Sequence, residues 1–189
     1  MIKFEAFSPG EIKTHGKGLK LTTGQASSPF GPVFLCTTGK GINSLEFETA
    51  TLPYEAWHRE ITALYPNADL VESHDDMQLL SDRIFGLHNR KDTVTLNLRG
   101  TPFQLQVWQA LVHLPAAQLA SYQQIANMLG KPKASRSVGS AIAKNPVGYL
   151  IPCHRVIQGT GELGQYRWSS ARKKALHIWE QGLVNNFNP

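Results

Sequence analysis

Cys153 is the residue whose surroundings in the sequence most clearly indicate chemistry. It stands between Pro152 and His154, inside the otherwise apolar run Leu150–Ile157. A cysteine attacks as the thiolate, and a free thiol with a pKa of about 8.5 is mostly protonated at neutral pH. A neighbouring imidazole can remove that proton. A lone cysteine is more often a buried core residue, so the case for a nucleophile depends on the rest of this half of the chain.

The histidine beside the cysteine needs further support to act as a base. Successive side chains of an extended chain point to opposite sides, so His154 would reach the thiol of Cys153 through a water molecule or a turn. A third group should orient the imidazole, and the acidic residues after residue 98 are Glu162 and Glu180. Glu180 lies near the end of a helix predicted from Ala171 to Gln181, where a carboxylate opposes the helix dipole. A partner could hold it there; a solvated glutamate at a frayed end explains the position equally well.

Charge is divided unevenly between the two halves of the chain. Residues 1–98 carry 9 Lys and Arg against 12 Asp and Glu, whereas residues 99–189 carry 10 against 2, a balance of +8. A basic face attracts polyanions, above all nucleic acid, through counterion release. The alternative is a basic surface that only keeps the protein soluble, and charge alone does not separate the two.

The cysteine count and the hydropathy pattern limit the class of protein. Cys36 and Cys153 provide neither a disulfide framework nor a CxxC zinc pattern. No apolar run approaches the ~20 residues that span a bilayer, and the N-terminus lacks the apolar segment of a signal peptide. We therefore expect a soluble intracellular protein in a reducing compartment, with Cys36 in a strand of the core.

The first half of the chain has the pattern of a small α/β domain. Residues 1–18 are rich in Gly and Lys and show no period, which predicts a tail or linker. The predicted strands cover residues 19–25, 33–36, 42–47 and 93–98. The second and third of them form a β-hairpin around a Gly-containing turn. The predicted helices cover residues 53–65 and 74–87, the latter from Met77, Leu80, Ile84 and Leu87 at helical spacing.

The second half has a mainly helical pattern. An apolar stripe over residues 103–114 predicts one helix. The run Ser121-Tyr122-Gln123-Gln124 is a capping box that opens the next helix, and Gly130 is its C-cap. Ser135 can cap a further short helix that ends before Asn145, because a proline follows. Two short helices joined by a tight turn indicate a helix-turn-helix.

The helix after Ser135 is unusual in composition. Small and basic residues predominate, and only Val138 and Ile142 are left to anchor it. Gly139 in its middle costs about 1 kcal/mol relative to alanine. Small side chains let two helices approach closely, but they also let a helix enter a confined groove of DNA while Arg136 reaches in. The basic flank favours the second interpretation. Downstream of the cysteine, the loop 159–166 is rich in glycine and is either a surface turn or the wall of a pocket.

These features coincide with a resemblance to a known family. Its motifs are Pro152-Cys153-His154-Arg155-Val156, Arg99-Gly100-Thr101-Pro102-Phe103, Val107-Trp108, Ser121-Tyr122, Gly130-Lys131-Pro132, Arg136, Asn145-Pro146-Val147 and Tyr166-Arg167-Trp168. In these motifs the chain resembles the O6-alkylguanine-DNA alkyltransferases, also called methylated-DNA–protein-cysteine methyltransferases. It is most similar to the alkyltransferase half of the bacterial adaptive-response protein. The resemblance runs from about Leu19 to Glu180 and is strongest from Arg99 onward.

The resemblance implies two domains with tails at both ends. Residues 19–98 would form an α/β N-terminal domain with a ribonuclease-H-like fold, in which helices cover a small antiparallel sheet. Residues 99–183 would form a mainly α C-terminal domain, a winged helix-turn-helix that binds DNA and carries the transfer reaction. Residues 1–18 and 184–189 would be tails.

The implied function is DNA repair in a single turnover. A methyl or larger alkyl group would pass irreversibly and stoichiometrically from O6-alkylguanine in double-stranded DNA to Cys153, with O4-alkylthymine as a second candidate substrate. The helix from Ser135 to Lys144 would enter the minor groove, and the damaged base would flip out of the duplex. No cofactor or metal would be needed. The protein would be a monomer, able in principle to bind DNA cooperatively, in the cytoplasm of a bacterium or the nucleus of a eukaryote.

The resemblance also assigns roles to single residues. Cys153, His154 and Glu180 would form a cysteine–water–histidine–glutamate relay. Tyr122 would crowd the phosphate beside the lesion and donate a proton to the guanine ring, and Asn145 would brace the turn before the active site. The residues contacting DNA would be Tyr122, Ser135, Arg136 as the arginine finger that fills the gap in the base stack, Ser137, Gly139, Ser140 and Lys144. The substrate pocket would be lined by Ile142, Val156, Leu163, Gly164, Tyr166, Arg167 and Trp168.

The sequence departs from the family pattern in two places. Arg167-Trp168-Ser169 stands where many members carry a glycine pair, so a large indole near the pocket predicts restricted access for bulky adducts. No cysteine-rich zinc domain precedes residue 19. The phosphotriester repair and transcriptional switching of the adaptive-response protein are therefore not expected from this chain.

Two other classes of protein fit parts of the sequence. One is a reader of alkylguanine that binds the lesion without reacting, but the known readers of this family lack the cysteine. The other is a cysteine hydrolase of papain type, which would pair Cys153 with a distant histidine, turn over repeatedly and ignore DNA. The net charge of +8 on residues 99–189 argues against the hydrolase, because such a charge favours binding to DNA.

Overall fold

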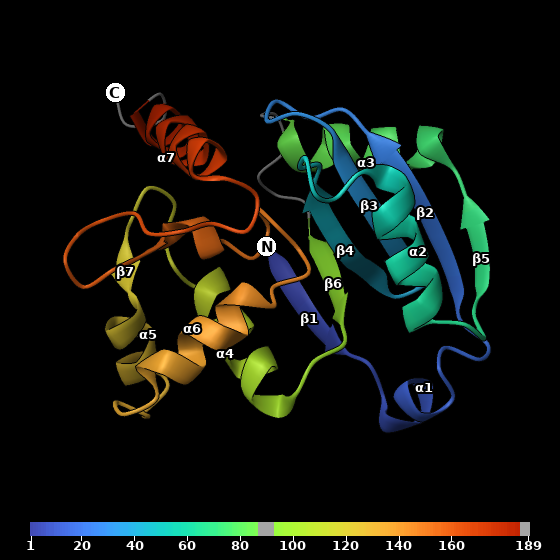
Figure 1. The fold of residues 1–189 in the computed structure, drawn as a ribbon, viewed down its shortest axis with the longest axis horizontal. Coiled ribbons are helices and arrows are strands. Elements are labelled where there is room, and N and C mark those ends of the chain that lie inside the picture. Colours follow the sequence, from blue (N-terminus) through green and yellow to red (C-terminus); the bar gives the residue numbers. More distant parts are fainter. Residues whose placement is uncertain (87–92, 186–189) are drawn as a thin grey trace. The chain divides into compact units, whose positions relative to one another are not determined.

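The chain divides into two compact units, Met1–Gly100 and Thr101–Pro189. The computed structural model describes residues 1–86 and 93–185, and Figure 1 shows the helices and strands of both units. Among the described helices, none combines the length and the apolar character needed to cross a bilayer.

The first unit is built on a six-stranded sheet with the order β1-β6-β4-β3-β2-β5 (Figure 1). The strands are β1 (Ile2–Ala6), β2 (Lys20–Ala26), β3 (Val33–Thr38), β4 (Gly41–Phe47), β5 (Asp69–Glu72) and β6 (Val94–Leu98). The predicted hairpin is confirmed, because β3 pairs antiparallel with β4 as well as with β2. However, β6 pairs parallel with β1 and β4, and β5 pairs parallel with β2. The expectation of a small antiparallel sheet is therefore wrong: β5 and β6 each follow a helix, and such crossovers return strands in parallel.

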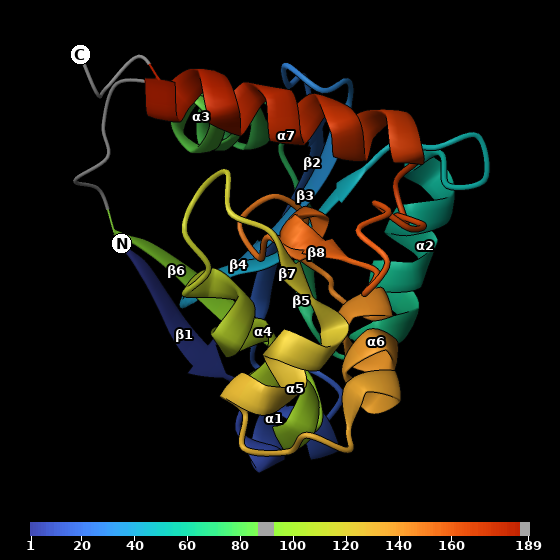
Figure 2. The same cartoon turned by 90° about the vertical axis from the view of Figure 1, so that its left-hand side faces the viewer.

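Helices cover both faces of this sheet (Figures 1 and 2). The helices of the unit are α1 (Pro9–Lys13), α2 (Tyr54–Leu64) and α3 (His74–Phe85). On one face, Trp57 of α2 packs in a buried cluster with Phe34 and Cys36. On the other, Phe85 of α3 lies with its ring centre 6.3 Å from that of Phe47. Burial raises the pKa of Cys36 to about 12, so this thiol is an inert core residue, as predicted. Leu87, at the end of the predicted helix, lies outside the described residues.

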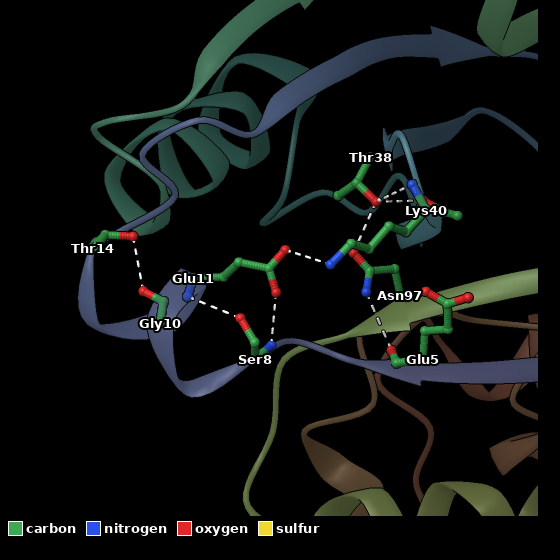
Figure 3. A network of polar contacts seen from close by, with 9 residues as sticks. Glu5, Ser8, Gly10, Glu11, Thr14, Thr38, Lys40 and Asn97 are labelled. Carbon is green, nitrogen blue, oxygen red and sulfur yellow. Dashed lines mark hydrogen bonds and ion pairs between the residues drawn. The ribbon is translucent and has the colours of Figure 1, made fainter.

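The N-terminal segment is part of the fold. β1 lies in register with β6, and α1 begins with a capping box formed by Ser8 and Glu11. Glu11 Oε1 also accepts a hydrogen bond from Lys40 Nζ at 2.8 Å (Figure 3). That bond, with one from the backbone N–H of Ser8, lowers the pKa of Glu11 to about 2. The prediction of a tail for residues 1–18 is wrong because β1 is short and its partner strand lies some ninety residues away, so no local period reveals it.

Asn97 of β6 links this segment to the hairpin from inside the sheet. Its side chain is fully buried; Oδ1 accepts a hydrogen bond from the hydroxyl of Thr38 at 2.8 Å, and Nδ2 donates to the carbonyl of Glu5 at 3.3 Å (Figure 3). Buried polar groups of this kind are costly to leave unpaired.

The second unit is mainly helical. Its elements are α4 (Pro102–Val112), β7 (Ala120–Ser121), α5 (Tyr122–Met128), α6 (Ser135–Ala143), the 3-10 turn η1 (Cys153–Arg155), β8 (Val156–Ile157) and α7 (Ser170–Asn185). Trp108 Nε1 donates a hydrogen bond to the carbonyl of Ala141 at 2.9 Å and so joins α4 to α6. The capping box between Ser121 and Gln124 is confirmed. The C-cap of α5 is Leu129, and the predicted Gly130 is the next residue, with the positive φ of 67° that is typical of a glycine directly after a helix. Figure 2 shows α4, α5 and α6 grouped together, with α7 lying over η1.

Two helix boundaries in this unit differ from the predictions. The sequence predicts Ser135 as the cap of α6, but the helix begins at Ser135 and its N-cap is Ala134, which makes no side-chain hydrogen bond. α7 continues to Asn185, so a tail over residues 184–189 is wrong for its first two residues. Residues 186–189 lie outside the described part of the chain.

Asn97→Ala should lower the free energy of unfolding of the first unit by roughly 1–3 kcal/mol, because it removes the side-chain acceptor of the buried Thr38 hydroxyl and the donor to the Glu5 carbonyl. Urea denaturation followed by tryptophan fluorescence measures this. Lys40→Met is the control, since it removes an exposed member of the same network and should barely move the midpoint. An Asn97→Ala protein as stable as the wild type would contradict the assignment of residues 2–13 to the folded unit.

Candidate active site

Cys153 lies at the start of the turn η1 rather than in extended chain. Pro152 precedes it with φ −80° and ψ 61°, and the N–H of Cys153 donates to the carbonyl of Ile151 at 2.7 Å. The turn at the proline that the sequence allows is therefore present. Cys153 is 6% exposed and His154 is completely buried.

Asn145 braces the segment that leads to this turn. It is buried, and its Nδ2 donates to the carbonyl of Ile151 at 3.0 Å and to Sγ of Cys153 at 3.1 Å. Its Oδ1 accepts a hydrogen bond from the N–H of Val147 at 2.9 Å. One side chain thus fixes both ends of the loop 145–153 and contacts the sulfur directly.

The thiol is protonated at rest. Burial raises the pKa of Cys153, and the hydrogen bond from Asn145, the nearby Tyr166 and the positive charge of Lys173 oppose that effect only in part. Burial and the closeness of Cys153 raise the pKa of Tyr166 well above its ordinary value, although its hydroxyl makes no hydrogen bond of normal geometry within the described residues. An attack by the sulfur therefore requires a base that acts at the same time.

His154, the next residue in the chain, carries the imidazole of the site. Its Nε2 lies 2.8 Å from Oε1 of Glu180. Burial would raise the pKa of Glu180, but hydrogen bonds from His154 and Arg155 lower it to about 2, so the carboxylate is ionised and can only accept. The proton of the neutral ring must then sit on Nε2, and Nδ1, buried and without a partner among the described residues, carries the free lone pair. Burial lowers the pKa of His154 despite Glu180, so the ring is neutral near pH 7.

Glu180 is the centre of a larger buried network. Nε of Arg155 donates to both carboxylate oxygens, at 3.1 and 3.0 Å, and its Nη2 to Oε1 at 2.7 Å. The N–H of Ala117 donates to Oε2 at 3.1 Å, and Nη1 of Arg155 binds the carbonyl of Leu114. The alternative that Glu180 is a solvated side chain at a frayed helix end is therefore wrong. Glu180 does not lie at the end of its helix either, because α7 runs more than a turn beyond it.

Lys173 is a buried residue next to the cysteine turn that was not predicted from the sequence. It is 1% exposed, and its Nζ donates to the carbonyls of Val156, at 2.6 Å, and Leu163. Burial lowers its pKa. The signal in the sequence is its place seven residues before Glu180, on the same face of α7. It ties the loop after the cysteine to the helix behind it.

A cavity of about 460 Å³ opens beside the thiol, within the size range of small-ligand sites. It is lined by Tyr122, Gly139, Ile142, Ala143, Asn145, Cys153, Gln165, Tyr166, Arg167 and Trp168. Of the predicted pocket residues, Ile142, Tyr166, Arg167 and Trp168 are in this set. Val156, Leu163 and Gly164 are not: Val156 is fully buried, and the loop is pinned through the two carbonyls bound by Lys173. Ala143 and Gln165 line the cavity without having been predicted.

α6 presents its polar residues outward beside this cavity. Val138 and Ile142 are buried and anchor the helix, as predicted, while Arg136, Ser137, Ser140 and Lys144 are exposed and Ser135 is half-buried. A Cβ added at Gly139 would meet the ring of Tyr122 at 3.7 Å, an ordinary contact. Internal packing therefore does not require the glycine, and its effect is to leave room in the cavity.

Comparisons with known proteins identify relatives along most of the chain. Residues 102–182 match the family model described as "6-O-methylguanine DNA methyltransferase, DNA binding domain". The "Bifunctional transcriptional activator/DNA repair enzyme Ada" of Escherichia coli is 44% identical over 62% of this chain, which spans only 34% of that relative. The crystal structure of Mycobacterium tuberculosis OGT in complex with DNA matches with a TM-score of 0.68 at 30% identity, over 86% of this chain and 94% of that one.

The "Methylated-DNA--protein-cysteine methyltransferase" of Mycobacterium leprae is 35% identical over 157 residues, covering 83% of this chain and 90% of the relative. A match of that extent, together with the folds and motifs above, places the chain in a family of DNA-repair methyltransferases. The chain belongs to the O6-methylguanine-DNA methyltransferase family.

Proposed function

We propose that this protein repairs DNA by moving the alkyl group of O6-alkylguanine, in double-stranded DNA, to the sulfur of Cys153. The observation that carries the proposal is the buried thiol on the wall of a 460 Å³ cavity, with a neutral histidine and an ionised glutamate behind it. The transfer is direct and irreversible, so each molecule acts once. O4-alkylthymine is a second candidate substrate.

The proposed step uses side chains of this protein and a bridging water molecule. His154, acting through water, takes the thiol proton on Nδ1 while Glu180 holds Nε2–H and stabilises the imidazolium. The sulfur attacks the alkyl carbon in line, the S–C bond forms and the C–O bond to guanine breaks. Tyr122 donates a proton to the leaving base. Burial and the nearby Cys153 raise the pKa of Tyr122, so the phenol is protonated before transfer and is a weaker acid than a free tyrosine.

The proposed DNA contacts come from α6 and its neighbours. The exposed residues Arg136, Ser137, Ser140 and Lys144, with Ser135 and Gly139, contact the minor groove, and Arg136 takes the place of the flipped base. α5 and α6, together with the short β7–β8 pair, support a winged helix-turn-helix, and the first unit supports a ribonuclease-H-like fold. Trp168, buried at the cavity wall, restricts the site to small adducts.

Cys153→Ala should bind duplex DNA containing O6-methylguanine about as tightly as the wild type and transfer nothing, because the cavity and α6 remain. Electrophoretic mobility shift and a radiolabelled methyl-transfer assay measure the two properties. Transfer retained by this variant would show that another residue is the nucleophile. Cys36, the other cysteine of the chain, is buried in the core of the first unit and is not expected to react.

Glu180→Gln should slow single-turnover transfer by roughly 10²-fold, because the imidazolium loses its negative partner. Rapid-quench kinetics measure this. Glu162→Gln, at the exposed acid of the same unit, should react at the wild-type rate. The wild type should also lose stability as the pH falls from the ordinary 4.5 of a glutamate towards 2, since the folded pKa is depressed, and Glu180→Gln should lose less. A variant with an unchanged rate would remove Glu180 from the relay.

Gly139→Ala should raise the free energy of unfolding by up to about 1 kcal/mol through helix propensity, yet slow transfer, because the added methyl group enters the cavity. Thermal unfolding and transfer kinetics measure the two effects. Gly182→Ala in α7, where an added Cβ meets nothing within 4 Å, is the matched control and should stabilise without slowing transfer. Equal kinetics for both variants would show that the space at Gly139 is not used by the substrate.

A further inference from the structure

One face of α7 carries three ionisable residues towards the cysteine turn. Lys173, His177 and Glu180 are spaced four and three residues apart, which places them on one side of a helix. The contacts of Lys173 and Glu180 are described above. His177 has no part in the proposed transfer, although its ring contacts that of His154, the proposed general base.

The imidazole of His154 lies between two other rings. The ring of Tyr149, a residue with a positive φ of 64°, is nearly parallel to it, with centres 6.3 Å apart and an angle of 10°. The ring of His177 meets it edge-on, with centres 5.7 Å apart and an angle of 64°. Nε2 of His177 is buried and has no hydrogen-bond partner among the described residues. The fully buried ring of His154 is therefore in contact with a second, half-buried imidazole at the site.

The ionisable groups around His177 are the same groups that surround Cys153 and His154. His154 faces it from η1, with Tyr149 on the far side of that ring, and Lys173 and Glu180 flank it on α7; Arg155 adds its charge on Glu180. Burial lowers the pKa of His177, and so do His154 and Lys173, while Glu180 and the backbone of His154 raise it.

We infer that His177 is a positioning residue whose neutral ring permits His154 to accept the thiol proton and whose protonated ring opposes it. The inference rests on the proposed function. When the proton leaves Sγ of Cys153, the ring of His154 becomes a cation 5.7 Å from the centre of His177. A second cation there raises the energy of that state, because like charges in a partly buried site repel. The S–C and C–O bond changes are otherwise those given above.

As a consequence, the protonation of both His154 and His177 sets the acid side of the pH–rate profile for transfer. Transfer is fast only in molecules in which both rings are neutral. Protonation of either ring removes a molecule from that population, so the rate falls on the acid side earlier than His154 alone would make it fall. Two coupled groups of this kind titrate as a pair.

The test is the pH profile of single-turnover methyl transfer for wild type, His177→Leu and His177→Gln. Both variants should shift the acid limb to lower pH, by about 0.3 unit if the two rings are equally basic, since one of two such sites is then removed. His113→Gln, at an exposed histidine of the same unit, should leave the limb in place. Acid limbs that coincide with that of the wild type would overturn the inference. Gln keeps a polar side chain at the position, so a folding defect in the Leu variant would not mask the result.

Imidazole NMR titration of the unreacted protein separates this inference from the proposed function. His154 should titrate over a broad pH range in the wild type and as a single site in His177→Leu. A His154 curve that is the same in both proteins would overturn the coupling, whatever the transfer assay shows. A wild-type protein whose rings are coupled but which transfers no methyl group at any pH would instead overturn the proposed function.

Discussion

The buried carboxylate of Glu180 is the interaction on which the rest of the site depends. An ionised group 2% exposed is stable only if its partners replace the lost water, and here His154, Arg155 and the N–H of Ala117 do so. These donors come from the cysteine turn and from the segment after α4, so the same carboxylate joins α7 to both. It also decides the chemistry of the histidine, because an acceptor at Nε2 leaves the lone pair on Nδ1.

Two opposing effects act on the thiol of Cys153: burial favours the protonated form, and polar neighbours favour the thiolate. Burial raises the pKa of Cys153, while the hydrogen bond from Asn145 favours the thiolate only in part. In the proposed reaction this neutral thiol becomes a nucleophile only when His154 takes its proton during attack. That arrangement suits a residue that reacts once. Asn145 holds the loop that leads to Cys153, and Lys173 binds two carbonyls of the segment that follows it.

The parts of this account that depend on local signals could be predicted from the sequence. The capping box at Ser121 and the hairpin of β3 and β4 are confirmed because turn and cap chemistry act within a few residues. The pairing of β1 with β6 and the role of Lys173 could not be predicted, because each depends on partners brought near only by the fold. The pairing of His154 with Glu180, 26 residues apart, came from the resemblance; position along the helix alone left it open.

The most direct test of the central claim is the stoichiometry of repair, measured by incubating the protein with excess O6-methylguanine duplex and mapping its peptides by mass spectrometry. The account predicts that repair stops after one lesion per molecule and that the peptide containing Cys153 gains the mass of one methyl group in place of a hydrogen. Many lesions repaired per molecule, or a Cys153 peptide of unchanged mass after repair, would contradict it.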